Sequence, residues 1–111
     1  GLGCQLDLAS LPLLPGARDL LLQGIESTLA PANRTAETKI DVAHSLRSIP
    51  EFDILFDPQT SGGLLLGVAP QHVDATLDRL RQQSDIPAAV IGTVVESRSD
   101  TPPLQLTMTE S

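Results

Sequence analysis

A polar segment that ends in two glycines separates two apolar runs near the middle of this chain, at residues 57–63 (Asp-Pro-Gln-Thr-Ser-Gly-Gly). The apolar runs, residues 54–56 and 64–68, predict buried elements on either side, so the fold must carry a polar loop between them. Gly62 and Gly63 can adopt positive φ and let another group approach the main chain. The hydroxyls of Thr60 and Ser61 can donate and accept, and backbone N–H groups in such a turn can converge on an anion. The loop therefore predicts recognition of an anion or of a partner's loop.

The pattern of apolar residues predicts a mixture of short strands and helices. Alternation at residues 4–8 and 104–108 favours strands, the second of them at a sheet edge, and β-rich or apolar runs at 63–68 and 88–95 favour two more. Helical spacing is found at 17–23, 49–56 and 70–83, whereas 26–39 is expected to be irregular and 40–46 is ambiguous. This order predicts a single α+β domain, with helices packed on a small mixed sheet of about four strands.

Composition narrows the class of protein. The net charge of −7 argues against sequence-independent binding to nucleic acid or to an anionic membrane surface. No apolar stretch approaches the roughly 20 residues that span a bilayer. The expected compartment is the cytoplasm, in keeping with the low cysteine content. Cys4 is the sole cysteine, which excludes an internal disulfide and gives no zinc site. Since Trp and Tyr are absent, the core is expected to consist of Leu, Ile and Val.

Residues 56–65 (Phe-Asp-Pro-Gln-Thr-Ser-Gly-Gly-Leu-Leu) resemble the signature of selenophosphate synthetase (selenide, water dikinase), within the wider aminoimidazole ribonucleotide synthetase superfamily. Residues 4–8, 14–16, 24–33 and 91–94 resemble other parts of the same family in the same order. The resemblance is to the C-terminal domain and implies the same α+β architecture. It also implies that residues 1–111 are one such domain, excised or naturally detached, and that the ATP-binding N-terminal half is absent from this sequence.

The resemblance implies a function for the whole enzyme, which converts ATP, selenide and water into selenophosphate, AMP and phosphate. The absent half would bind most of the ATP and Mg²⁺ and would be the main partner of this domain, and a homodimer of the full-length protein is compatible with it. The domain alone is expected to be inactive. One alternative is a non-catalytic interaction module. Another is the terminal domain of a fusion with a flavin-dependent pyridine-nucleotide oxidoreductase.

The candidate binding residues follow from the same loop. Phosphate or substrate would contact Thr60, Ser61, Gly62 and Gly63, with Asp57, Gln59 and Asn33 in support. No catalytic or metal-ligating residue is expected, because His44 and His72 have no ligand-spaced partner. The simpler alternatives are a tight turn for the loop, an Asx-turn for Asp57 and a structural brace for Gln59.

Charge limits what this loop can bind unaided. No Lys or Arg lies between Glu51 and Gln71, so a polyanion would require Mg²⁺ or lysines from the absent half. Arg34 could offer a forked donor to phosphate, or it could be a solvated surface charge.

Overall fold

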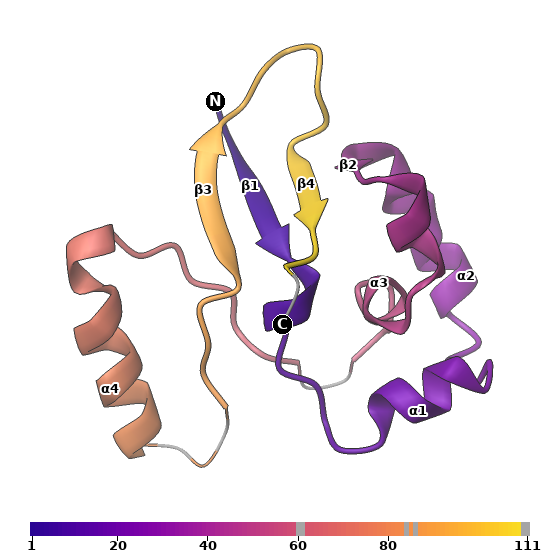
Figure 1. The fold of residues 1–111 in the computed structure, drawn as a ribbon, viewed down its shortest axis with the longest axis horizontal. Coiled ribbons are helices and arrows are strands. Elements are labelled where there is room, and N and C mark those ends of the chain that lie inside the picture. Colours follow the sequence, from indigo (N-terminus) through magenta and orange to yellow (C-terminus); the bar gives the residue numbers. More distant parts are fainter. Residues whose placement is uncertain (60–61, 84, 86, 110–111) are drawn as a thin grey trace.

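The computed structural model describes residues 1–59, 62–83, 85 and 87–109. A four-stranded mixed sheet lies at its centre, in the order β2-β4-β1-β3 (Figure 1). β1 (Leu2–Asp7) pairs in parallel with β4 (Leu104–Thr107) and antiparallel with β3 (Gly92–Glu96), and β2 (Ile40–Asp41) is parallel to β4. This sheet and its helices confirm the predicted α+β class.

Four α-helices and four 3₁₀ turns connect the strands in the described part of the chain. The α-helices are α1 (Ala17–Leu22), α2 (Ala30–Asn33), α3 (Pro50–Ile54) and α4 (Val73–Gln83). The 3₁₀ turns are η1 (Leu8–Ser10), η2 (Arg34–Lys39), η3 (His44–Ser48) and η4 (Pro70–His72). The helices predicted at 17–23, 49–56 and 70–83 are thereby confirmed, with shorter α-helical bounds for all three, since η4 occupies the start of the last one.

Three local predictions were wrong: an irregular stretch at 26–39, an edge position for β4, and a strand at 63–68. Residues 26–39 are not irregular, because α2 and η2 occupy most of them, and Pro31 lies in the first turn of α2, where its missing N–H costs nothing. β4 is not an edge strand, since the two-residue strand β2 covers its outer side through the pairs Ile40–Leu104 and Asp41–Gln105. A strand of two residues is too short to leave a periodic signal.

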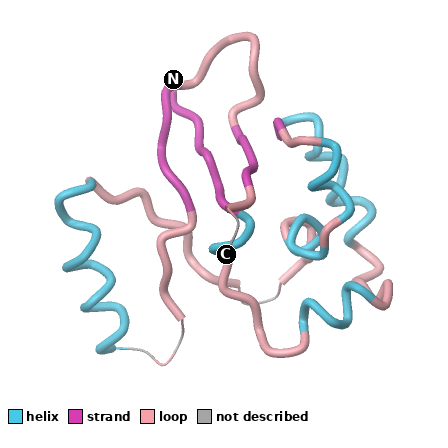
Figure 2. Tube along the Cα trace, viewed as in Figure 1, coloured by secondary structure: helices cyan, strands magenta, loops and turns pink. Residues whose placement is uncertain are grey.

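The strand predicted at 63–68 is also absent, and Figure 2 shows this segment as a loop between α3 and α4. Leu64 is 90% exposed and Leu65 is 70% exposed. A continuous apolar run predicts that the segment is buried, but it does not identify the element or protein that covers it. In this structure the run has no neighbouring strand among the described residues, so the expectation that both flanks of the loop are buried fails on this side.

The core lies where β1, β2 and β4 meet α3. Its buried cluster contains Leu6, Leu8, Ile40 and Leu106, together with Phe52 and Phe56. The phenyl rings of the two aromatic residues meet edge to face, with centroids 5.2 Å apart. The expectation of a Leu, Ile and Val core was therefore incomplete: both aromatic residues are central, and no valine is among the buried residues described.

α4 lies away from this core. Figure 1 shows it beyond β3, on the opposite side of the sheet from α2 and α3. None of its residues is buried, and Leu80 remains 38% exposed. The apolar stripe thus predicted that α4 is a helix, but it did not predict whether α4 is buried. The helix that packs most clearly against the sheet is α3. No helix in the described ranges is long and apolar enough to cross a membrane.

Asp7, at the end of β1, joins the two ends of the described chain. Its carboxylate accepts hydrogen bonds from the Thr109 N–H (2.9 Å) and hydroxyl (2.7 Å). It also accepts from the Ser10 hydroxyl and the Ala9 N–H, which caps η1. These bonds, chiefly the one from the Thr109 hydroxyl, lower the pKa of Asp7 from 3.8 to about 2.

Asp7→Asn is expected to lower the free energy of unfolding at neutral pH, because the substitution removes the charge that strengthens these bonds. The folded-state pKa is depressed, so the carboxylate stabilises the fold fully above pH 3.8, and this contribution disappears as the pH falls towards about 2. Urea unfolding of both proteins at a series of pH values checks this. The two stabilities should converge in acid; a constant difference would contradict the assignment. Asp78→Asn on exposed α4 is the control.

Candidate functional site

The 57–63 loop begins immediately after Phe56, whose side chain is buried in the core. After α3 the chain makes a final turn, in which the Phe56 N–H donates to the Asp53 carbonyl and the Asp57 N–H donates to the Ile54 carbonyl. Phe56 is only 3% exposed, whereas Asp57 is half-buried and Gln59 is exposed. The first residue of the loop is therefore held against the core, whereas Gln59, Gly62 and Gly63 are exposed. Thr60 and Ser61, two of the predicted binding residues, lie outside the described residues.

The two glycines of the loop do not adopt the backbone conformation expected of them. Positive φ occurs at Gly16 and Gly24 among the described residues, and not at Gly62 or Gly63. A Cβ added to Gly63 would meet no atom within 4 Å, and one added to Gly62 would approach the flexible Gln59 side chain at 2.8 Å. Backbone strain is therefore no reason for glycine here, and the exposed main chain is open to another molecule. Gln59 is the side chain that borders this opening.

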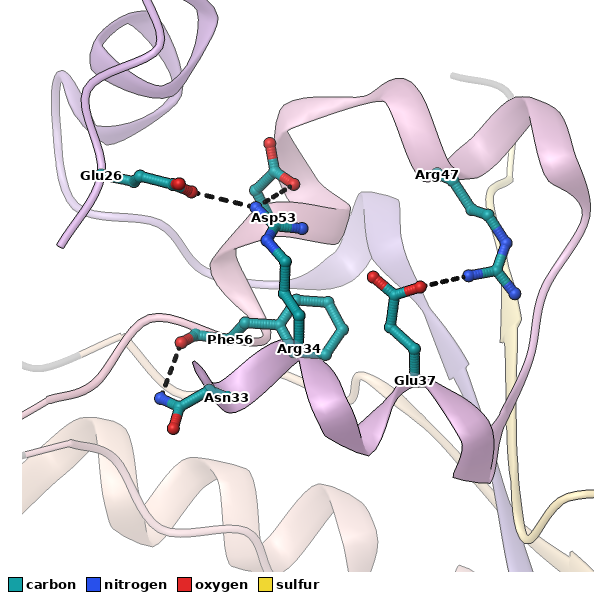
Figure 3. Close-up of polar contacts among 7 residues, drawn as sticks. All are labelled: Glu26, Asn33, Arg34, Glu37, Arg47, Asp53 and Phe56. Atoms are coloured by element: carbon teal, nitrogen blue, oxygen red, sulfur yellow. Dashed lines mark hydrogen bonds and ion pairs between the residues drawn. The ribbon is translucent and has the colours of Figure 1, made fainter. Parts of the chain in front are cut away.

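Asn33, the last residue of α2, contacts the residue that precedes the loop. Its side-chain Nδ2 donates to the Phe56 carbonyl at 2.9 Å, as Figure 3 shows. This contact joins residues 23 positions apart and occupies one of the two donor hydrogens of the amide. The structure thus gives Asn33 a bracing contact next to the loop, and the proposed contact with phosphate stays a prediction.

Arg34 is a half-buried, ion-paired cation of this cluster, so the alternative of a freely solvated surface charge was wrong. Its Nη2 donates to Glu26 at 3.0 Å and to Asp53 at 2.9 Å, and its guanidinium lies 5.3 Å from the centre of the Phe56 ring (Figure 3). Partial burial, the largest single influence, lowers the pKa of Arg34, but the hydrogen bonds and charges of Asp53 and Glu26 together raise it above its usual value. Two carboxylates bound to Nη2 already offset the positive charge that would attract a phosphate.

A second pair of similar chemistry lies beside the first. Arg47 donates to Glu37 at 2.7 Å, and its guanidinium lies 5.7 Å from the centre of the Phe52 ring. Phe52 is inside α3 and does not adjoin the loop. The chain therefore contains two arginine–carboxylate–phenylalanine clusters, and Arg34 belongs to the one next to residues 57–63.

A shallow cavity of about 450 Å³ opens beside the Asn33–Phe56 contact. Its walls come from α2, η2, β2, the end of α3 and the start of β4, and its lining residues are Asn33, Ala36, Lys39, Ile40, Leu55, Phe56, Pro103 and Leu104. The lining is largely apolar, with Lys39 as its one cationic residue. Within the described ranges, no group of three His, Cys, Asp or Glu side chains could hold a metal ion.

Sequence reasoning singled out Asn33 but missed the partners that surround it. Glu26, Asp53 and the Phe56 carbonyl converge on Asn33 and Arg34 from separations of 8 to 23 residues. Periodicity reports only contacts within an element, so no sequence signal indicated these partners. The resemblance at Asn33 was the nearest clue.

Comparison with known families gives a match over most of this architecture. The model of "AIR synthase related protein, C-terminal domain" matches residues 18–104, which include the loop and the Asn33–Arg34 cluster.

Curated relatives point in the same direction. A selenide, water dikinase of Nitratidesulfovibrio vulgaris (strain Miyazaki F) is 37% identical over 97 residues, which is 86% of this chain and 27% of the relative. Its counterpart in the Hildenborough strain is 38% identical over 103 residues, covering 92% and 29%. The selenide, water dikinase of Caldanaerobacter subterraneus is 32% identical over 98 residues, covering 88% and 28%. This chain thus spans less than a third of the length of these relatives.

Gly63→Ala is expected to leave the free energy of unfolding unchanged within about 0.5 kcal/mol, because the site has no strain and no steric conflict. Gly16→Ala is the contrasting variant: Gly16 has φ of 86° at the start of α1, so alanine there should cost about 1 kcal/mol. Urea unfolding of both variants checks this pair. A large loss of stability in Gly63→Ala would show that the loop is held by contacts that the described residues do not include.

Proposed function

Since this chain belongs to the family of AIR synthase related C-terminal domains, we propose that it is the C-terminal domain of a selenide, water dikinase. The observation that carries the proposal is identity of 32–38% to three such enzymes over 86–92% of the chain. The whole protein would convert ATP, selenide and water into selenophosphate, AMP and phosphate. It would work in the cytoplasm, and residues 1–111 alone would be inactive, because they span less than a third of the length of these relatives and would lack the ATP-binding half.

In this proposal the 57–63 loop forms one wall of the phosphate or substrate site. Thr60 and Ser61 would supply hydroxyl donors, and Gly62 and Gly63 would supply backbone N–H groups with no side chain in the way. The open space at Gly63 supports this role. Asp57 and Gln59 would support the loop from its core-facing and exposed sides.

From the ion pairs of three arginines we infer that the domain does not bind phosphate strongly by itself. Arg18, Arg34 and Arg47 are each paired with a carboxylate. Phosphoryl transfer relies on positioning and on neutralising charge, so ATP would need Mg²⁺ and cations from elsewhere in the enzyme. The N-terminal ATP-binding half would provide most of these contacts.

Exposed apolar residues support the proposed contact with that half. Leu64, Leu65 and Leu66 are 90%, 70% and 56% exposed, and they directly follow the loop. A contiguous exposed apolar segment is typical of a surface that another protein surface covers. The same observation supports the second candidate function, a non-catalytic interaction module, in which an unrelated protein would cover it. A fusion to a flavin-dependent pyridine-nucleotide oxidoreductase is a third arrangement, which reading the gene upstream of Gly1 decides.

The partner prediction is tested by adding the N-terminal half in trans. The 111-residue chain alone should form no selenophosphate by ³¹P NMR, and a separately produced N-terminal half should restore activity on mixing. Replacing Leu64 and Leu65 by Ser should weaken that restoration about tenfold or more, because each exposed Leu would lose its burial at the interface. The control is Leu14→Ser, another exposed leucine, far along the chain from the loop. Selenophosphate from the isolated chain would refute the proposal.

The loop prediction is tested in the full-length protein. Thr60→Ala with Ser61→Ala, and separately Gly63→Val, should lower kcat/KM for ATP by about 10²-fold, as loss of preorganised donors to a transferring group does. Thr93→Ala, at an exposed position of β3, is the matched control. Loop variants with the kinetics of the control would remove the loop from the phosphate site.

A further inference from the structure

The peptide unit between Phe56 and Asp57, where the loop begins, is held from both ends. Its carbonyl oxygen accepts from Asn33 Nδ2 at 2.9 Å, and its N–H donates to the Ile54 carbonyl at 3.2 Å. A peptide unit is planar, so fixing both its oxygen and its nitrogen fixes the orientation of the whole plane. The direction in which residues 57–63 leave α3 therefore depends on a side chain of α2.

The side chain of Phe56 is fixed as well. Its ring packs edge to face with Phe52 on one side and under the Arg34 guanidinium on the other. Arg34 in turn is held by Asp53, which lies one turn before Phe56 and Asp57 (Figure 3). Glu26 anchors the same guanidinium to the segment that precedes α2. Two consecutive residues, Asn33 and Arg34, thus restrain the backbone and the ring of the residue that precedes the loop.

We propose that Asn33 and Arg34 are positioning residues for the 57–63 loop. Asn33 orients the Phe56–Asp57 peptide, and Arg34 locks the Phe56 ring and Asp53 against α2, so that the chain enters the loop at Asp57 in a fixed direction. This inference rests on the proposed function of the loop. It requires no contact of Asn33 or Arg34 with the phosphate: one Asn33 donor hydrogen already serves Phe56, and two carboxylates already pair with Arg34.

The second cluster of the chain provides a matched control. Arg47 has a carboxylate partner and a phenylalanine ring, as Arg34 has, but its ring belongs to Phe52 inside α3. A general loss of stability should follow from disturbing either cluster. A loss of loop geometry should follow only from disturbing the cluster of Asn33 and Arg34.

The experiment compares Asn33→Asp, Arg34→Lys and the control Arg47→Lys. Asn33→Asp keeps the size of the side chain but replaces the donor by a carboxylate that faces the Phe56 carbonyl. Arg34→Lys keeps the charge but loses the planar guanidinium, which lies over the Phe56 ring while its Nη2 contacts both Glu26 and Asp53. Each is made in the full-length protein, where kcat, KM for ATP and the melting temperature are measured. Each is also made in the 111-residue chain, where the ¹H–¹⁵N shifts of Asp57, Gln59, Gly62 and Gly63 are recorded.

The expected result is a fall in kcat of about 10- to 100-fold for Asn33→Asp and Arg34→Lys, the size of effect that a displacement of about 1 Å produces. The loop amide shifts should move in both variants. Arg47→Lys should lower the melting temperature to a similar extent while kcat and the loop amides stay close to wild type. If Asn33→Asp does not fold, Arg34→Lys against Arg47→Lys decides the question.

Two other outcomes overturn the inference, and they are distinguishable. If the Thr60, Ser61 and Gly63 variants lose activity but Asn33→Asp and Arg34→Lys behave as Arg47→Lys does, the loop function stands and the positioning role is wrong. If the loop variants themselves retain full activity, the proposed function of the loop fails, and the positioning role fails with it.

Discussion

The edge-to-face contact of Phe52 and Phe56 connects the core of the sheet to the residues at the start of the 57–63 loop. Both rings are almost fully buried against Leu6, Leu8 and Leu106, and they are the only aromatic residues of the chain. Such pairs contribute about 0.5–1.5 kcal/mol beyond the burial of their area. Because Phe56 lies in the turn that follows α3, the packing that stabilises the core also sets where the 57–63 loop begins.

Two arginines, Arg34 and Arg47, pack on this aromatic pair. Arg34 and Arg47 each place a guanidinium near one of the two rings and satisfy it with acidic side chains. Partly buried cations of this kind require paired carboxylates, because an unpaired charge away from water is costly. The same pairing removes these cations from phosphate binding. Under the proposed function, a domain arranged in this way would shape a phosphate site and depend on another part of the enzyme for positive charge.

The other side of the molecule has the opposite character. Residues 64–68 are apolar yet exposed, and α4 lies away from the core without a buried residue. In a family whose relatives are more than three times as long as this chain, exposed leucines beside the loop are consistent with a surface that contacts another domain. The residue before the loop, Phe56, therefore belongs to the packed core, whereas the residues after the loop, 64–68, are exposed.

The sequence by itself determined the class of the fold, the positions of α1, α3 and α4, and the location of the candidate loop, because periodicity and turn chemistry are local properties. It also singled out Asn33. Only the tertiary structure decided that Asn33 braces Phe56, that Arg34 is neutralised by Glu26 and Asp53, and that β4 is an inner strand. These facts depend on contacts between residues far apart in the chain, which no local pattern encodes. The exposure of residues 64–68 has the same origin, since an apolar run shows that a partner is needed and not where the partner lies.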